Sequence, residues 1–367
     1  MKKKKAFYFA LSILALSFGS CHNDDDDNDN NDDIIPPSNV IEITSNITTA
    51  TTWLDGKIYL IKKYDFYVEA SLTIQGGAII KFHPTLGPYM MLGTAGTVIA
   101  NGSASKPIIF TSYKDDSHGG DTNADGTATT PASKDWGYVN TNGMNGSIFN
   151  YCEFYYGGND SYSTTLSVES NSSATVTNCT FAHNDGNDAS GGYGVLDASN
   201  ASAATVIQGN IFYDNIRPLS INTLFSLDNS NVFHNPANNT QTNTYNGIFV
   251  ESINEVTSNI TWSEKEVAYV IDDNDFWIDN TFHLTLADSV VLKFLPSSEI
   301  VLANGSSSIV NYNGSGVYFT SFKDDTKKGD TNGDGSVTTP ANSDWEGIYD
   351  DQGSAYVSWS SILYDNH

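Results

Sequence analysis

The chain has 367 residues and a formal net charge of −26 at pH 7, because 43 acidic residues outnumber 17 lysines and arginines. So negative a protein repels nucleic acid and other polyanions, which argues against them as partners, and it favours divalent cations. Beyond the N-terminal leader, no apolar run is long enough to cross a membrane as a helix.

Residues 1–20 have the features of a secretory signal peptide: four lysines, a mostly apolar run over Ala6–Phe18, and the small pair Gly19-Ser20. Cys21 follows directly, which resembles a bacterial lipobox, whose cysteine is lipidated and becomes the mature N-terminus. Phe18 stands where a lipobox usually has leucine, so simple secretion is the alternative. We expect a protein anchored in the outer membrane through Cys21 and exposed at the cell surface.

Residues 21–40 are predicted to be a disordered acidic tether. His22–Asp33 contains seven aspartates and no apolar residue, so this segment cannot bury enough surface to offset its ordering entropy. It resembles the acidic leader behind the lipidated cysteine of surface lipoproteins in some Gram-negative bacteria. Pro36-Pro37 closes the tether.

The chain repeats a long passage. Thr111–Trp136 recurs as Thr320–Trp345, 209 positions later, and Leu72–Phe82 is matched by Leu284–Phe294. Self-similarity at such a distance indicates tandem architecture.

The repeat divides the chain into two modules, which we place at 41–253 and 254–367. The final residues 353–367 match residues 146–160, but nothing in the second copy matches residues 161–252. The second module is therefore predicted to be a shortened copy of the first.

Short apolar runs separated by Asn, Gly, Asp and Ser dominate both modules, a pattern that indicates an all-β chain. In the middle section one phrase recurs with its phenylalanine at Phe154, Phe181, Phe212 and Phe233, in steps of 27, 31 and 21 residues. Unequal steps of this size are expected from successive coils whose strands recur but whose turns differ in length. We expect these rings to point inward and stack, with asparagine recurring at one turn because it tolerates left-handed backbone.

The phrases LTIQGGAIIKF (72–82) and VIANGSASKPIIFTS (98–112) resemble the opening coils of secreted bacterial proteins of the pectate-lyase-like superfamily. This resemblance implies an all-β fold, a right-handed parallel β-helix in two tandem modules. An array of β-sandwiches is the alternative. The resemblance says little about activity, since a fold does not fix a function.

Cys152 and Cys179 begin equivalent phrases 27 residues apart, close to one coil. The two thiols are therefore expected on adjacent coils. A disulfide is compatible with an extracellular protein, and a ladder of two buried free thiols is the alternative.

Each module contains a D-x-N-x-D-G loop, formed by Asp121, Asn123 and Asp125 in the first copy and by Asp330, Asn332 and Asp334 in the second. Oxygen ligands on alternate residues, followed by a glycine that allows a sharp turn, can wrap Ca²⁺. The loops resemble the first half of an EF-hand or dockerin loop.

Position twelve departs from that pattern, because Ala132 in the first loop, and its counterpart in the second, replaces the bidentate glutamate. The flanking residues Asp116 and Asp135, with Asp325 and Asp344 in the second copy, are predicted to supply the missing charge. The cation would have a structural role, pinning the loop so that the following tryptophan docks on the coil. The alternative is an Asx-rich surface turn that binds nothing.

Catalytic signals are weak. Arg217 is the single arginine and a weak candidate for the base of a calcium-dependent polysaccharide lyase; the alternative is a surface arginine at a turn. A glycoside hydrolase needs carboxylates on neighbouring coils, for which the candidates are Asp185, Asp188, Asp197 and Asp214. His183 and His234 are interpreted as turn residues.

Binding has more support, because tyrosines gather around the later coils of the first module. They are Tyr151, Tyr155, Tyr156, Tyr162 and Tyr193. Aromatic faces on a rigid surface stack on sugar rings, although the same residues also serve simply to cover a solenoid. The leading hypothesis is non-enzymatic adhesion to a glycan or a surface protein. A β-helix lyase or hydrolase is the competing class, and a spacer is the third.

Overall fold

The computed structural model describes residues 39–83, 88–159, 164–186, 193–251, 255–272, 275–279, 281–304 and 308–367. The expected signal peptide, Cys21 and most of the tether lie outside these ranges. Residues 36–367 form one compact unit. Among the described residues, no helix has the length and apolar character that a membrane crossing requires.

Three long sheets, all parallel, make up most of the unit. Sheet A contains β1 (Val40–Ile43), β3 (Ile58–Ile61), β6 (Ile79–Phe82), β9 (Ile108–Ser112), β12 (Cys152–Tyr155), β15 (Thr180–Ala182) and β18 (Ile211–Tyr213), in that order. Sheet B contains β4 (Asp65–Val68), β7 (Tyr89–Leu92), β10 (Val139–Asn140), β13 (Leu166–Ser167), β16 (Leu196–Ala198), β19 (Leu219–Asn222), β22 (Gly247–Glu251), β24 (Ala268–Asp272), β27 (Val291–Phe294) and β30 (Tyr318–Ser321). Sheet C contains β2 (Thr51–Trp53), β5 (Ser71–Gln75), β8 (Thr97–Asn101), β11 (Ser147–Asn150), β14 (Ala174–Thr177) and β17 (Val206–Gln208).

Three smaller sheets complete the unit. Sheet D contains β23 (Ile260–Trp262), β26 (Leu284–Leu286) and β29 (Ile309–Val310). Sheet E contains β25 (Asp275–Ile278), β28 (Glu299–Leu302), β31 (Gly347–Asp350) and the antiparallel β32 (Ala355–Tyr356). An antiparallel hairpin joins β20 (His234–Asn235) to β21 (Asn238–Thr242).

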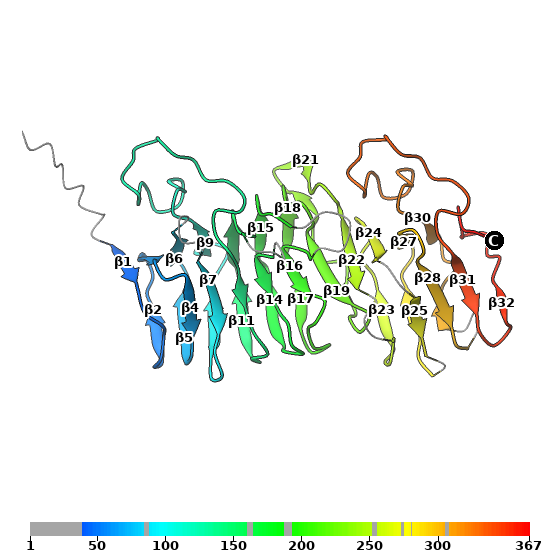
Figure 1. The fold of residues 1–367 in the computed structure, drawn as a ribbon, viewed down its shortest axis with the longest axis horizontal. Coiled ribbons are helices and arrows are strands. Elements are labelled where there is room, and N and C mark those ends of the chain that lie inside the picture. Colours follow the sequence, from blue (N-terminus) through cyan, green and yellow to red (C-terminus); the bar gives the residue numbers. More distant parts are fainter. Residues whose placement is uncertain are drawn as a thin grey trace, which may run out of the picture. The chain divides into compact units, whose positions relative to one another are not determined.

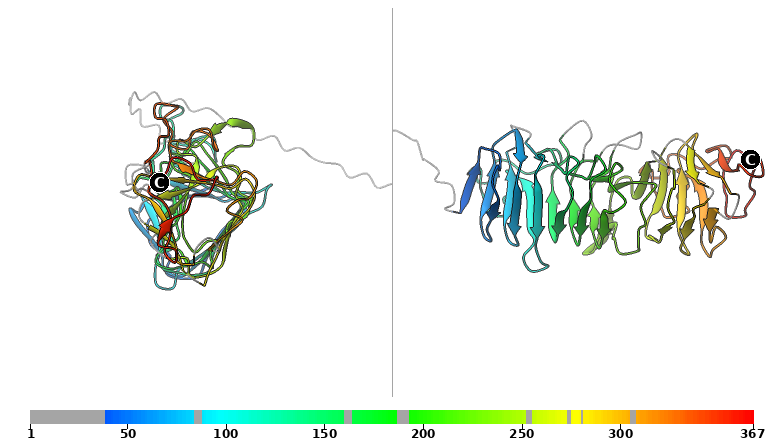
Figure 2. Two further views of the ribbon diagram at one scale, coloured as in Figure 1. Left: turned by 90° about the vertical axis from the view of Figure 1, so that its right-hand side faces the viewer. Right: turned by 90° about the horizontal axis from the view of Figure 1, so that it is seen from below.

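As far as β19 the chain winds through sheets C, A and B in turn, and from β23 onward it winds through sheets D, B and E. In these sheets each strand pairs in parallel with the strand one coil later, except that β32 pairs with β31 in antiparallel fashion. The protein is therefore an all-β parallel β-helix, as the sequence predicted. Figure 1 shows the coils side by side, and the end-on view in Figure 2 shows them superposed in a three-sided outline. The apolar residues of all three faces fill the interior.

The phenylalanine ladder is confirmed. The rings of Phe154 and Phe181 are 4.8 Å apart, those of Phe181 and Phe212 are 5.2 Å apart, and those of Phe212 and Phe233 are 5.3 Å apart, all stacked. Phe110 extends the ladder by one coil at 4.7 Å. These separations are close to the ~4.8 Å between neighbouring strands, so each coil adds one ring to the stack.

Asparagines also form a ladder, although for a different reason than expected. Asn184, Asn215 and Asn243 are buried, and each donates its amide to a main-chain carbonyl one coil back and accepts or donates along the row. The left-handed backbone falls on the preceding residues, His183 (φ 60) and Asp214 (φ 52). The asparagine is thus needed for its hydrogen-bonding amide, and His183 is a turn residue, as predicted.

A seam separates the two copies. β6 and β9 belong to sheet A, whereas their repeat counterparts β27 and β30 belong to sheet B. Sheet A ends near Val232, where the β20–β21 hairpin begins, and sheet E begins with the bridge between Val256 and Ile278. Sheet B runs unbroken through the expected boundary at 253, because β22 pairs with β24. The second copy is therefore displaced by one face around the helix axis.

The two cysteines occupy equivalent positions on β12 and next to β15, and both are free and fully buried. Each thiol lies near a main-chain carbonyl of sheet C, with Cys179 Sγ 3.3 Å from Phe149 O. Burial raises the pKa of the Cys152 thiol well above its ordinary value. Of the two alternatives, the structure contains the ladder of free thiols.

Candidate functional site

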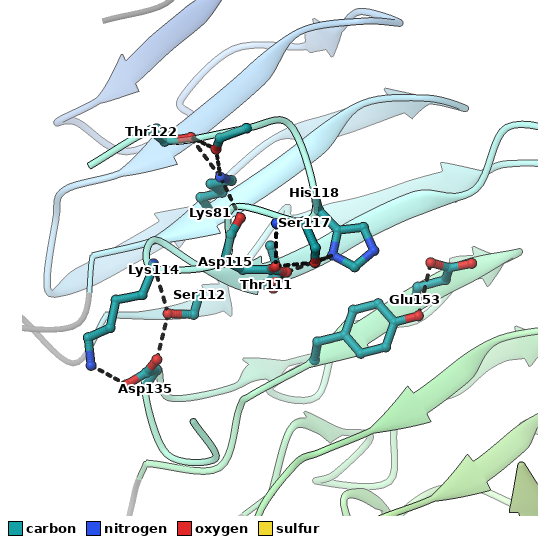
Figure 3. Close-up of polar contacts among 12 residues, drawn as sticks. Lys81, Thr111, Ser112, Lys114, Asp115, Ser117, His118, Thr122, Asp135 and Glu153 are labelled. Atoms are coloured by element: carbon teal, nitrogen blue, oxygen red, sulfur yellow. Dashed lines mark hydrogen bonds and ion pairs between the residues drawn. The ribbon is translucent and has the colours of Figure 1, made fainter. Parts of the chain in front are cut away.

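The two acidic loops leave the solenoid after β9 and β30 and rise from the same side of it (Figure 1). Beneath the first loop lies Lys81, a fully buried residue of β6. Its ammonium donates to Asp115 O and Gly120 O, each at 2.9 Å, and to Thr122 Oγ1 at 2.6 Å (Figure 3). Burial lowers the pKa of Lys81 to about 8, against the opposing effect of the aspartates around it. The lysine thus ties the loop to sheet A.

The loop turns on Asp121, whose two carboxylate oxygens accept from the main-chain N–H groups of Asp125 and Gly126 at 3.1 and 2.8 Å. This turn brings together Asp116, Asp121 and Asp125, each of which offers an oxygen within 4.8 Å of the others. The side-chain amide of Asn123 donates to Asp125 at 2.9 Å.

Two oxygens at this cluster are buried without a hydrogen-bond partner among the described residues: Asp116 Oδ1 and Asn123 Oδ1. Burial and the nearby Asp121 raise the pKa of Asp116, so the carboxylates repel one another there. Three carboxylates and an amide oxygen are the donors that a hard cation such as Ca²⁺ prefers. The residues present could therefore hold such a cation.

Asp135, the other flanking residue named as a possible ligand, is not part of this cluster. Its carboxylate accepts from Ser112 Oγ at 2.7 Å and from Ala132 N at 3.0 Å, and pairs with Lys114 at 2.7 Å (Figure 3). Asp135 therefore closes the base of the loop.

The tryptophan after each loop docks on the coil, as expected. The indole of Trp136 stacks on Phe82 at 4.2 Å and donates to Tyr155 O at 2.7 Å. In the second copy Trp345 stacks on Phe294 at 3.9 Å and donates to Leu363 O at 2.9 Å.

The second loop repeats this chemistry. Asp325, Asp330 and Asp334 form the same kind of cluster, and Asp325 Oδ1 is again buried without a partner among the described residues. Lys293 on β27 donates to Gly329 O and Thr331 Oγ1, each at 2.8 Å, and burial lowers its pKa to about 8.

Two other residues of this loop complete the parallel. Asn332 donates to Asp334 at 3.0 Å, and Asp344 closes the base against Ser321 and Lys323, each at 2.7 Å. Hydrogen bonds, chiefly from Thr338, lower the pKa of Asp334 to about 2.

Arg217 is fully buried, which is contrary to the surface alternative. Its guanidinium lies 3.7 Å from the centre of the Phe249 ring and 3.9 Å from Glu251 Oε1. A cation enclosed in this way is placed to hold β19 against β22 and has no exposed surface with which to touch a polymer.

The three described aspartates considered for hydrolysis, Asp185, Asp197 and Asp214, do not converge. Asp185 pairs with Lys134 at 2.7 Å, and Asp214 lies 3.3 Å from His183. Asp188 lies outside the described residues. Asp197, by contrast, lines a hollow on sheet B.

This hollow, of about 360 Å³, lies on the outer face of sheet B, and we call it the sheet-B groove. Its lining residues are Met91, Tyr138, Asn140, Thr164, Ser167, Glu169, Tyr193, Asp197 and Asn200. Strand register places Met91, Asn140, Ser167 and Asp197 opposite one another on successive strands, so they form one row across β7, β10, β13 and β16. This row is a floor that runs along the helix axis. Tyr138 and Tyr193 precede their strands and Glu169 follows its strand, which places tyrosines and carboxylate on opposite sides.

The polar groups of the groove are held in place. Asn140 donates its amide to Glu169, and Ser199 N donates to Asp197 Oδ1 at 3.0 Å. Asp197 is 4% exposed, and burial raises its pKa to about 6 despite the hydrogen bonds from Ser199. Tyr138 stacks by one face on Tyr89 of the preceding coil, at 5.1 Å.

Of the four described tyrosines singled out from the sequence, Tyr193 alone lines this groove. Tyr155 stacks on His118 and Tyr156 on His183, and Tyr151 occupies a left-handed turn. Tyr162 lies outside the described residues.

Sequence reasoning missed Lys81 and Lys293, although their signal was present: both copies place one lysine at the same point of an otherwise apolar strand, IIKF and VLKF. It also missed Tyr138, Asn140 and Glu169, which carry no comparable signal, because only strand register shows that they share a groove.

Comparisons of the chain with protein-family models, with curated proteins and with solved structures found no match. The class that the fold defines is that of all-β parallel β-helix proteins.

Proposed function

We propose that this protein is a calcium-stabilised β-helix that binds a glycan in the sheet-B groove. The observation that carries the proposal is the groove itself: a floor of ordered polar side chains between two tyrosines and a carboxylate. Sugar-binding sites combine aromatic faces with a few fixed hydrogen-bonding groups in this way. Six of the nine lining residues, Glu169, Tyr193 and Asp197 among them, lie in the stretch 161–252 that has no counterpart in the second copy, which supports a role beyond the repeated framework.

The proposed location follows from the leader. A lipid at Cys21 and an acidic tether would hold the β-helix at the outer membrane. The two tyrosines beside the polar floor of the groove favour a glycan over a protein partner. The acidic loops would bind calcium between their three clustered carboxylates. The ion would have a structural role, adding to the attachment by which Lys81 and Lys293 already hold each loop on the coil beneath it.

The test is retention of the soluble form, residues 34–367 with calcium, on immobilised neutral and acidic polysaccharides. We expect retention on at least one glycan, and loss of it in Tyr138→Ala and Tyr193→Ala. Trp277→Ala is the matched control, since Trp277 is 36% exposed on β25 in another sheet. If no glycan retains the wild-type protein, or if the control loses as much binding as the groove variants, the proposal is wrong.

Hydrolysis is the second candidate function, and one observation favours it. Glu169 and Asp197 come from neighbouring coils and line the same groove, and a carboxyl group with a pKa of about 6 suits a general acid. Release of reducing ends from a retained glycan, abolished in both Glu169→Gln and Asp197→Asn, would establish an enzyme. Retention without cleavage would leave a binding protein.

A further inference from the structure

The sheet-B groove has a sharply uneven charge. Two carboxylates, Glu169 and Asp197, line it, and none of its described lining residues carries a positive charge. Arg217 is close enough to lower the pKa of Asp197 slightly against its burial, but it is not among the lining residues and its guanidinium is covered by Phe249. A ligand in the groove therefore meets negative charge that the described lining does not balance.

The position of the two carboxylates makes their charge effective. Asp197 is almost fully buried at one end of the floor, where the low dielectric strengthens electrostatic interactions. Glu169 is held by the amide of Asn140, so it cannot swing away without breaking that hydrogen bond. A uronate carboxylate placed here would have to leave water beside two fixed like charges, whereas a sugar hydroxyl can donate to either of them.

The floor also has a direction. Along the helix axis it changes from the thioether of Met91 through the amide of Asn140 and the hydroxyl of Ser167 to the carboxylate of Asp197. Three strand spacings at ~4.8 Å make this row roughly 14 Å long, which suits a short segment of a chain rather than a single ring. A segment lying along it would have its less polar part over Met91 and a hydroxyl-rich part at Asp197.

We infer that the sheet-B groove takes an uncharged segment of a glycan chain, whose hydroxyls donate to Glu169 and Asp197, and that it rejects acidic glycans. This inference rests on the proposed glycan binding and adds the class of sugar. It sets this groove apart from one built for uronates, which needs cations to neutralise the substrate.

The test uses neutral and acidic forms of the same backbone. The probes are fully methyl-esterified galacturonan against polygalacturonate, and hydroxyethylcellulose against carboxymethylcellulose, with binding measured at pH 7.5 and constant ionic strength. We expect the neutral member of at least one pair to bind at least roughly tenfold more tightly than its acidic partner, since juxtaposed like charges disfavour a complex strongly.

The double variant Glu169→Gln with Asp197→Asn removes the charges and keeps the acceptors for Asn140 and Ser199. It is expected to bind the acidic partner at least roughly tenfold better than the wild type does. The control, Asp275→Asn with Asp351→Asn, makes the same change in net charge at exposed positions outside the groove.

The outcomes separate the two proposals. Absence of binding to every neutral and acidic probe would contradict glycan binding itself and this inference with it. Equal binding of neutral and acidic partners by the wild type would overturn the inference alone. So would a control that gains as much affinity for the acidic glycan as the groove variant, because the discrimination would then come from the net charge of the whole protein.

Discussion

Asn215 offers the sharpest test of what holds the coils in register. Its amide lies in the interior and makes four hydrogen bonds to neighbouring coils: it donates to Phe181 O at 2.8 Å and to Asn243 Oδ1 at 2.9 Å, and it accepts from the main-chain and side-chain N–H groups of Asn184, both at 3.1 Å. Replacement by alanine removes all four at once.

The cost can be worked out from the groups left behind. Asn184 keeps a second acceptor for its side chain, Phe154 O at 2.9 Å, and Asn243 Oδ1 keeps a bond from the Asn215 main chain at 3.3 Å. The main-chain N–H of Asn184 loses its side-chain acceptor, and Phe181 O loses its side-chain donor. Each buried polar group left without its partner destabilises by about 1–3 kcal/mol, so Asn215→Ala is expected to lower the free energy of unfolding by about 2–6 kcal/mol.

The assay is urea unfolding of residues 36–367 followed by tyrosine and tryptophan fluorescence. Asn239→Ala is the control, because Asn239 is exposed on β21 close by and a surface substitution of this kind changes stability by less than about 0.5 kcal/mol. A loss below about 1 kcal/mol for Asn215→Ala would refute the reasoning that the amide ladder carries buried hydrogen bonds that water cannot replace.

Three further predictions follow from the same physical terms. Burial raises the pKa of Glu264 to about 7, so this group binds more protons in the folded state than in the unfolded state between pH 4.5 and 7. Stability should fall as pH rises through this window, and Glu264→Gln should reduce that fall in thermal melts, leaving the part that Asp197 contributes. Cys152 and Cys179 should resist a thiol reagent in the native protein and react at the rate of unfolding, so rapid native labelling would contradict their burial. Chelation of calcium should lower the melting temperature of the wild type by several degrees and leave Asp125→Ala with Asp334→Ala unaffected; an unchanged wild-type melt would contradict structural calcium.

The sequence predicts the class of fold because each coil of a solenoid is formed by a short, continuous stretch of residues. The steps between Phe154, Phe181 and Phe212 report coil lengths, and the rings stack as that reading requires. The docking of Trp136 is predictable for the same reason, since the repeat marks it as a fixed point after a variable loop.

Features that depend on which strands become neighbours are not predictable in this way. The phrase around Arg217 looks like a surface turn, but Phe249, one coil later, covers the guanidinium. The sequence gives no reason to prefer Asp116 over Asp135 as a ligand, but in the structure Ser112 and Lys114 bind the carboxylate of Asp135 at the base of the loop.

The seam explains why two similar copies need not have the same function. Sheet A ends at the β20–β21 hairpin, whereas sheet B continues into the second copy. Lys81 therefore lies on sheet A, but its counterpart Lys293 lies on sheet B, the sheet that carries the groove. The second acidic loop consequently folds back onto the seam: Lys328 Nζ donates to Lys265 O, and a side chain at Gly333 would collide with Thr244 O at 2.7 Å. A cation in this loop would brace the join between the copies, whereas one in the first loop would brace coils within a single copy.

Unfolding of Asp334→Ala should therefore begin at the seam, and unfolding of Asp125→Ala at the N-terminal coils. Hydrogen exchange with calcium present can distinguish the two variants. The same pattern of early exchange in both would contradict this difference.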